Sequence, residues 1–136
     1  MGDPQLDVET LNDGISGKLI TPFAVKVRGK EITVPAGFKT DFASVPRLFW
    51  NLAPPWGKYS RAAVVHDWLY QSGITEKDVA DLIFKALMIR YGVPAWKAEV
   101  MYKAVKWFGG AAWKACRKRQ QSLPVNVGGP WREVSK

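Results

Sequence analysis

The sequence predicts an α+β fold in a single domain. Three features indicate this: a length of 136 residues, strand-type alternation in the first third of the chain, and helix-type spacing of apolar residues after residue 60. Apolar residues make up 47% and charged residues 24% of the chain, which are the proportions of a folded protein. We expect an extended lead-in over residues 1–18, one globular domain over residues 19–121 and an irregular basic tail over residues 122–136.

A β-hairpin is expected first. Residues 19–21 and 23–27 alternate between apolar and polar types, Arg28–Lys30 supply a turn, and residues 31–34 return as the second strand. Proline and glycine residues then punctuate a long connection that contains a short helix around residues 47–52. Connections of this length often build functional sites, and here the loop is expected to pack on the helices together with the hairpin.

The first two of about three main helices follow this loop. Ser60 is expected to cap the first helix, which ends before Gly73, and Thr75 is expected to cap the second, which Gly92 closes. Apolar residues recur at helical spacing in both segments, so each helix should turn one stripe toward the core. The expected stripes consist of Ala62, Val65, Trp68, Leu69, Val79, Leu82, Ile83, Ala86 and Leu87.

Pro94 is expected to open the third helix, which runs towards Arg119 with a kink or break at Gly109–Gly110. Its apolar stripe continues on both sides of the two glycines, so both parts should pack on the same core. This stripe consists of Met101, Val105, Phe108 and Ala112.

The sole histidine, His66, lies in the first helix beside Asp67, with Tyr70 four residues further on. Residues four apart share a helix face, so His66 and Tyr70 project together, whereas Asp67 points about 100° around the helix. The second helix should run back antiparallel after a short loop, which places Asp78 or Asp81 near the middle of the first helix. A carboxylate at that place could orient His66.

A neutral imidazole held by a carboxylate is a general base suited to activating water near neutral pH. Asp67 is then a candidate ligand for a hard cation such as Ca²⁺, with backbone carbonyls from the loop over residues 37–44 or 54–58. Asp41 is a second candidate metal ligand, although an Asp in such a loop more often shapes a turn. Together these groups would suit ester hydrolysis in which the metal stabilises the developing oxyanion.

The pattern His-Asp-x-x-Tyr at residues 66–70, followed by Ala-Asp-x-x-Phe at residues 80–84, resembles the paired-helix active site of the phospholipase A2 superfamily. The resemblance implies that His66 is the general base and Asp67 a calcium ligand. It also implies that the tyrosine and the distal aspartate, Asp81, support the histidine. The cysteines that staple the helices of that superfamily are absent from this chain, and no glycine-rich calcium loop of the usual form precedes the histidine.

A longer resemblance runs from Val-Pro-Ala-Gly-Phe-x-Thr-Asp-Phe-Ala-Ser-Val-Pro at residues 34–46, through His-Asp-Trp-Leu-Tyr at residues 66–70, to Ala80–Asp81. This pattern is similar to the phage and prophage family called domain of unknown function 1353 and covers about the central half of the chain. The resemblance implies a biological context rather than a reaction. The protein is expected to be encoded by a bacteriophage, made in the cytoplasm of the bacterial host, and either retained there or carried in the virion.

The formal charge is +8, and most of the basic excess lies after Met101. Such a charge attracts polyanions in general, and nucleic acid, anionic lipid and an acidic protein surface all fit it. Trp96, Trp107 and Trp113 alternate with lysines, as in helices that lie on membranes, although core packing explains most tryptophans. Nucleic-acid binding by Arg117–Arg119 has no accompanying motif, and a solvated basic helix end is the ordinary explanation.

The leading interpretation is a phage-encoded, phospholipase A2-like hydrolase that uses Ca²⁺. The alternatives are a non-enzymatic virion or tail-assembly component that binds other phage proteins, and a nucleic-acid-binding accessory protein. The candidate site residues also have structural explanations, namely a buried polar network, or for Asp81 an exposed ion pair with Lys85. A single cysteine, Cys116, excludes an internal disulfide, and we expect neither a signal peptide nor a membrane span.

Overall fold

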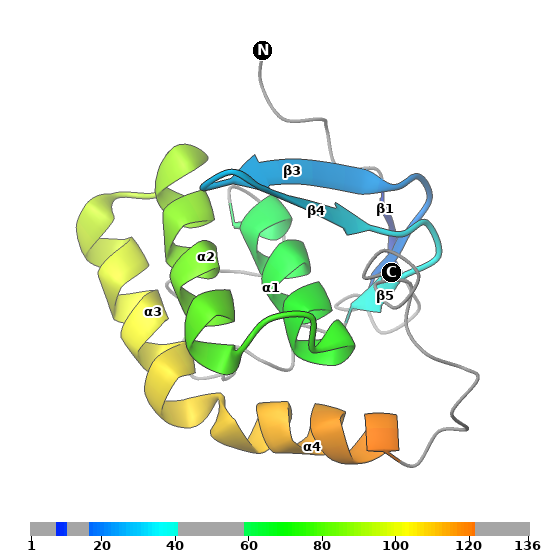
Figure 1. Ribbon diagram of the computed structural model, residues 1–136. Coiled ribbons are helices and arrows are strands. Elements are labelled where there is room, and N and C mark those ends of the chain that lie inside the picture. The colour runs from blue at the N-terminus through cyan, green and yellow to red at the C-terminus, as the bar shows by residue number, and fades with distance from the viewer. Residues whose placement is uncertain (1–7, 11–16, 41–58, 122–136) are drawn as a thin grey trace.

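The computed structural model describes residues 8–10, 17–40 and 59–121, and Figure 1 shows their arrangement. Strands come first and helices follow, so the predicted α+β fold is confirmed. Three helices, α1 to α3, lie side by side in Figure 1, and the fourth, α4, runs beneath them. The start of the expected loop, residues 35–40, is described and contains a short strand at Lys39–Thr40. The rest of the loop, with the expected short helix, and the expected C-terminal tail lie outside the described residues.

Two small antiparallel sheets make up the β part of the fold. One sheet has the strand order β1-β2-β5, and the other is the pair β3-β4. The strands are β1 (Val8–Thr10), β2 (Gly17–Leu19), β3 (Phe23–Val27), β4 (Lys30–Val34) and β5 (Lys39–Thr40). The first sheet thus reaches into residues 1–18, where the sequence indicated an extended lead-in.

The predicted hairpin is the pair β3-β4, in which Phe23 lies opposite Val34 and Val27 opposite Lys30. Its two turn residues, Arg28 and Gly29, have φ angles of 53° and 78°. Positive φ at both central positions matches the twist of the flanking strands, as in a type I′ turn. The apolar side chains of both strands point to one face and are buried, so this face closes the core at one end of the helices.

The helices are α1 (Ser60–Ser72), α2 (Lys77–Arg90), α3 (Ala95–Phe108) and α4 (Gly110–Gln121). The predicted kink or break is a complete break at Gly109, so the described residues form four helices where we expected about three. A Cβ atom at Gly109 would lie 2.5 Å from the carbonyl oxygen of Val105 and 2.6 Å from the hydroxyl of Tyr70. Glycine at this position therefore lets the chain approach α1 closely.

The predicted helix caps are displaced by one residue. Ser60 is the first residue of α1 and Tyr59 its N-cap, while Glu76 rather than Thr75 is the N-cap of α2. The Thr75 hydroxyl instead donates to the carbonyl oxygen of Glu76 at 3.2 Å. Gly73 closes α1 as expected, in the left-handed conformation and with its N–H bonded to a carbonyl of the last turn.

Helix α1 is buried on nearly all sides, whereas the sequence predicted a single buried stripe. It packs against α2 and α4 on the helical side and against β4 and β5 on the other. Burial therefore extends to its polar residues His66 and Asp67. Two residues that the sequence placed in buried stripes are exposed instead: the side chains of Leu82 and Phe108 are 43% and 61% exposed.

Helix α4 is held against the C-terminal end of α1 by Arg117. The Nη2 atom of its guanidinium donates to the carbonyl oxygens of Tyr70 at 2.7 Å and Gln71 at 3.1 Å. These carbonyls belong to the last turn of a helix, where no intrahelical donor remains for them. The indole of Trp113 lies beneath the same guanidinium and also meets the ring of Tyr70 edge-on.

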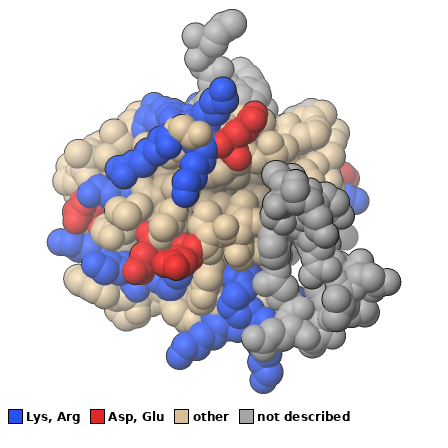
Figure 2. Space-filling model, in the orientation of Figure 1, with Lys and Arg blue, Asp and Glu red and all other residues tan. Residues whose placement is uncertain are grey.

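Basic side chains gather at two places on the face of the molecule drawn in Figure 2. Figure 2 shows Lys and Arg side chains gathered near the β3-β4 turn and the end of α2, and again over α4. None of the helices in the described ranges is long and apolar enough to cross a membrane.

Candidate functional site

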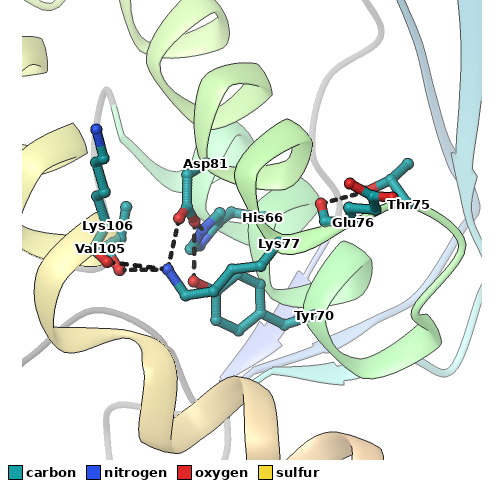
Figure 3. Close-up of polar contacts among 8 residues, drawn as sticks. All are labelled: His66, Tyr70, Thr75, Glu76, Lys77, Asp81, Val105 and Lys106. Atoms are coloured by element: carbon teal, nitrogen blue, oxygen red, sulfur yellow. Dashed lines mark hydrogen bonds and ion pairs between the residues drawn. The ribbon is translucent and has the colours of Figure 1, made fainter.

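The centre of the candidate site is a hydrogen bond between α1 and α2. His66 Nε2 lies 2.7 Å from Asp81 Oδ1, and both side chains are essentially inaccessible to solvent. Figure 3 shows the two side chains pointing toward each other across the helix pair. The antiparallel return of α2 thus produces the contact that the sequence predicted for Asp81. Asp78, the other candidate, is exposed in the first turn of α2.

Tyr70 also contacts Asp81, as the sequence indicated. Its hydroxyl donates to Asp81 Oδ1 at 2.9 Å, so one carboxylate oxygen accepts two hydrogen bonds from α1. The Tyr70 ring lies fully buried one helical turn from His66, and its hydroxyl approaches the backbone at Gly109. The break between α3 and α4 thereby makes room for the tyrosine that braces the carboxylate.

Lys77 completes the site, although no sequence motif predicts it. Its ammonium donates to Asp81 Oδ2 at 2.8 Å and to the carbonyl oxygens of Val105 at 3.0 Å and Lys106 at 3.2 Å (Figure 3). Those carbonyls lie in the last turn of α3, which carries partial negative charge. The i,i+4 spacing from Lys77 to Asp81 was the one sequence signal for this pair.

The charge of the site resides on Asp81 and Lys77. Burial raises the pKa of the Asp81 carboxyl, but hydrogen bonds from His66, Lys77 and Tyr70 outweigh it and hold the pKa below the ordinary value. Asp81 is therefore a carboxylate at neutral pH, and Lys77 is its ionic partner. Burial, helped by the adjacent carboxylate, raises the pKa of the Tyr70 hydroxyl, which remains a donor.

His66 is the neutral member of this group. Burial lowers the pKa of its imidazole more than the hydrogen bond to Asp81 raises it. A carboxylate can only accept, so the neutral ring carries its proton on Nε2 and its basic lone pair on Nδ1. Phe84 stacks on the ring with 4.5 Å between centroids and an interplanar angle of 25°, which fixes the plane of the imidazole.

Asp67, the predicted calcium ligand, projects toward the β part of the fold. Its Oδ2 accepts a short hydrogen bond from the hydroxyl of Thr40 in β5, and its side chain is 3% exposed. Asp41, the second predicted ligand, lies outside the described residues. Among the described residues no group of three or more His, Cys, Asp or Glu side chains lies together. The calcium role of Asp67 and Asp41 stays a prediction.

One structural alternative for Asp81 is wrong. Lys85 pairs with Glu99 of α3, at 2.5 Å, and not with Asp81. Asp81 is buried instead of exposed. The other alternative, a buried polar network without a catalytic role, has the same contacts as the candidate site. A hydrolysis assay distinguishes the two.

Comparison with known proteins gives the family. A family described as "Protein of unknown function (DUF1353)" matches residues 18–105. The chain belongs to the DUF1353 family. The matched stretch of this DUF1353 protein includes α1 and α2 entirely, and with them the His66–Asp81 pair, but it stops before α4.

A curated relative is the "Uncharacterized protein y4jT" of Sinorhizobium fredii, which is 36% identical over 83 residues. The aligned part is 60% of this chain and 25% of the relative, so the DUF1353 protein spans about a quarter of the relative's length. No solved structure matches the chain. Neither match names a phospholipase or a phage.

Proposed function

We propose that this DUF1353 protein is a phospholipase A2-like hydrolase in which His66 acts as the general base. The observation that supports the proposal is the hydrogen bond from His66 Nε2 to the Asp81 carboxylate. This bond fixes the tautomer in which Nδ1 is basic. Burial lowers the pKa of the imidazole below its ordinary value, so the ring is neutral at pH 7 and can accept a proton.

Each residue has a distinct part in the reaction. His66 Nδ1 takes a proton from a water molecule while the water oxygen attacks the ester carbonyl carbon. The protonated ring then gives that proton to the departing alcohol oxygen and becomes neutral again. Asp81 stabilises the transient imidazolium, and Tyr70 and Lys77 are positioning residues that keep Asp81 charged and in place.

Burial sets a condition on this mechanism. His66 has no exposed surface, so an ester reaches the ring only when neighbouring residues move apart. Because the chain has one histidine, chemical modification by diethyl pyrocarbonate reports on this residue alone among imidazoles. We expect slow modification of the folded protein that becomes faster as urea approaches the unfolding transition.

The direct test is ester hydrolysis by the full chain. Release of fatty acid from phosphatidylglycerol vesicles is measured for wild type, His66→Gln and Asp81→Asn, with calcium and with a chelator. We expect His66→Gln to lose at least 100-fold in rate, the usual contribution of a general base. Asp78→Asn is the matched control for Asp81→Asn, because it removes the same charge from an exposed position on the same helix.

The outcomes separate the hydrolase from its alternatives. Circular dichroism and a melting curve first establish that each variant is folded. Hydrolysis that survives His66→Gln in a folded protein would refute the mechanism, and a folded wild type without hydrolysis would refute the function. Loss of activity in the chelator would support the calcium ligand role proposed for Asp67 and Asp41.

The biological setting belongs to the same proposal. The similarity of residues 34–46 and 66–70 to phage and prophage proteins supports a phage-encoded protein made in the bacterial cytoplasm. Detection in purified particles would place it in the virion, and detection only in infected cells would place it outside the virion.

A further inference from the structure

The outer face of α3 carries tryptophans that the core does not use. Trp96, Lys103 and Trp107 are seven and four residues apart, a spacing that aligns them on one side of a helix. The opposite side holds the buried residues Ala98 and Met101. We call Trp96, Lys103 and Trp107 the tryptophan face.

These side chains are exposed to an unusual degree. Trp96 is 61% and Trp107 66% exposed, and the neighbouring Phe108 is 61% exposed. Of the six large apolar side chains exposed in the described part of the chain, five belong to α2 and α3. Exposed large apolar side chains gathered on two neighbouring helices make this part of the surface a candidate for interaction.

The helix that carries the tryptophan face has a basic excess. Among its residues 95–108 are three lysines, Lys97, Lys103 and Lys106, and one acidic residue, Glu99, which leaves a formal charge of +2. Glu99 is already paired with Lys85 and Lys103. Lys97 extends beside the indole of Trp96, with its ammonium 5.7 Å from the ring centre. An approaching surface therefore meets two exposed indoles on a helix that also presents lysines.

We propose that the tryptophan face binds an anionic lipid surface, with the two indoles at the headgroup level and the lysines against lipid phosphates. Indole rings are amphipathic and favour the membrane interface, and lysines beside them gain attraction from anionic lipid. The helix would lie on the membrane, since no helix of the described part can span it.

Two other partners fit this face less well. The core of a protein interface is depleted of lysine, whereas here Lys103 lies between the two tryptophans. Single-stranded nucleic acid stacks successive bases on aromatic rings that lie close together. Trp96 and Trp107 are eleven positions apart, which places them roughly 16 Å apart along the helix, too far for successive bases. A flat, anionic surface matches both the spacing and the charge.

The experiment is flotation of the full chain with vesicles at low and high salt. Wild type is expected to bind vesicles containing phosphatidylglycerol at least tenfold more tightly than pure phosphatidylcholine, and less tightly as salt rises. The double variant Trp96→Ala/Trp107→Ala should lose at least tenfold in affinity. Ile20→Ala is the control, because it removes another exposed apolar side chain, 54% exposed, that lies outside the helices.

Further variants make the result decisive. Lys97→Gln/Lys103→Gln should reduce the preference for anionic lipid, and melting curves should show that these surface variants fold. Equal binding by wild type and the double tryptophan variant would overturn the proposal, as would equal binding to both kinds of vesicle. His66→Gln should bind as wild type does, so failure of the hydrolase and failure of this surface remain distinguishable.

Discussion

Two lysine–acid pairs with the same helical spacing allow a sharp test of the site's energetics. Lys77 pairs with Asp81 at 2.8 Å, where the carboxylate is 1% exposed and the lysine 18% exposed. Lys103 pairs with Glu99 at 3.6 Å, and those side chains are 50% and 40% exposed. Replacing either lysine by methionine removes one charge and keeps the length of the side chain.

The two substitutions should have very different effects on stability. Removing one partner of a buried ion pair costs about 3–5 kcal/mol, but Lys77 is partly exposed and Asp81 keeps two donors. We therefore expect Lys77→Met to lower the free energy of unfolding by about 2–3 kcal/mol. For a chain of this length the melting temperature should fall by roughly 6–15 °C. Lys103→Met should change neither quantity measurably, because exposed pairs contribute little.

The assay is urea unfolding monitored by circular dichroism at pH 7, repeated in high salt. The loss in Lys77→Met should persist in salt, since a buried pair is poorly screened. The folded pKa of Asp81 lies below its ordinary value of 3.8, so the stability from its charge is complete above 3.8 and is lost as the pH falls through the folded pKa. Equal effects of Lys77→Met and Lys103→Met would refute the conclusion that burial makes Lys77 the main ionic partner of Asp81.

Three further predictions concern the same group of residues. Tyr70→Phe should lower the free energy of unfolding by about 1–2 kcal/mol in urea titration, because the buried Asp81 loses one donor; no change would mean that water replaces the hydroxyl. The free energy of unfolding should fall as the pH drops below 6.5, because the unfolded His66 binds a proton that the buried ring resists, and His66→Gln should flatten this part of the pH profile. Gly109→Ala should lower the free energy of unfolding by about 1–3 kcal/mol in thermal melting, since its Cβ would clash with a backbone carbonyl and the Tyr70 hydroxyl. The control is Gly110→Ala, where nothing lies within 4 Å, and it should leave stability unchanged or slightly raised. Equal losses in the two variants would contradict this explanation.

The elements that the sequence predicted correctly depend on local physics. The hairpin follows from alternation and from a turn in which Gly29 adopts positive φ without a steric penalty. The His66–Asp81 contact follows from helical spacing and one short connection, which together leave few ways to place α2. The catalytic roles of these residues, and of Asp67 and Asp41 with calcium, remain predictions.

The features that the sequence did not reveal depend on distant parts of the chain. The periodicity of a helix does not show how many elements pack around it. The sequence therefore predicts one buried stripe for α1, whereas the structure buries the helix on nearly all sides. Lys77 has two of its partners 28 and 29 residues away, at the end of α3, and no pattern around Lys77 points to them. The exposure of Leu82 has the same origin, because α2 turns the face with Asp81 toward α1.

The contact between α4 and α1 joins a helix outside the family match to a helix inside it. The family match stops at residue 105, yet Arg117 and Trp113 cover the end of the helix that carries His66. A segment of thirteen residues is marginal as an isolated helix in water and needs its neighbours to persist. A fragment trimmed to residues 18–105 would keep His66, Tyr70, Lys77 and Asp81 and yet lose α4, which packs on the end of α1. Expression trials on relatives should therefore retain whatever sequence follows the matched segment.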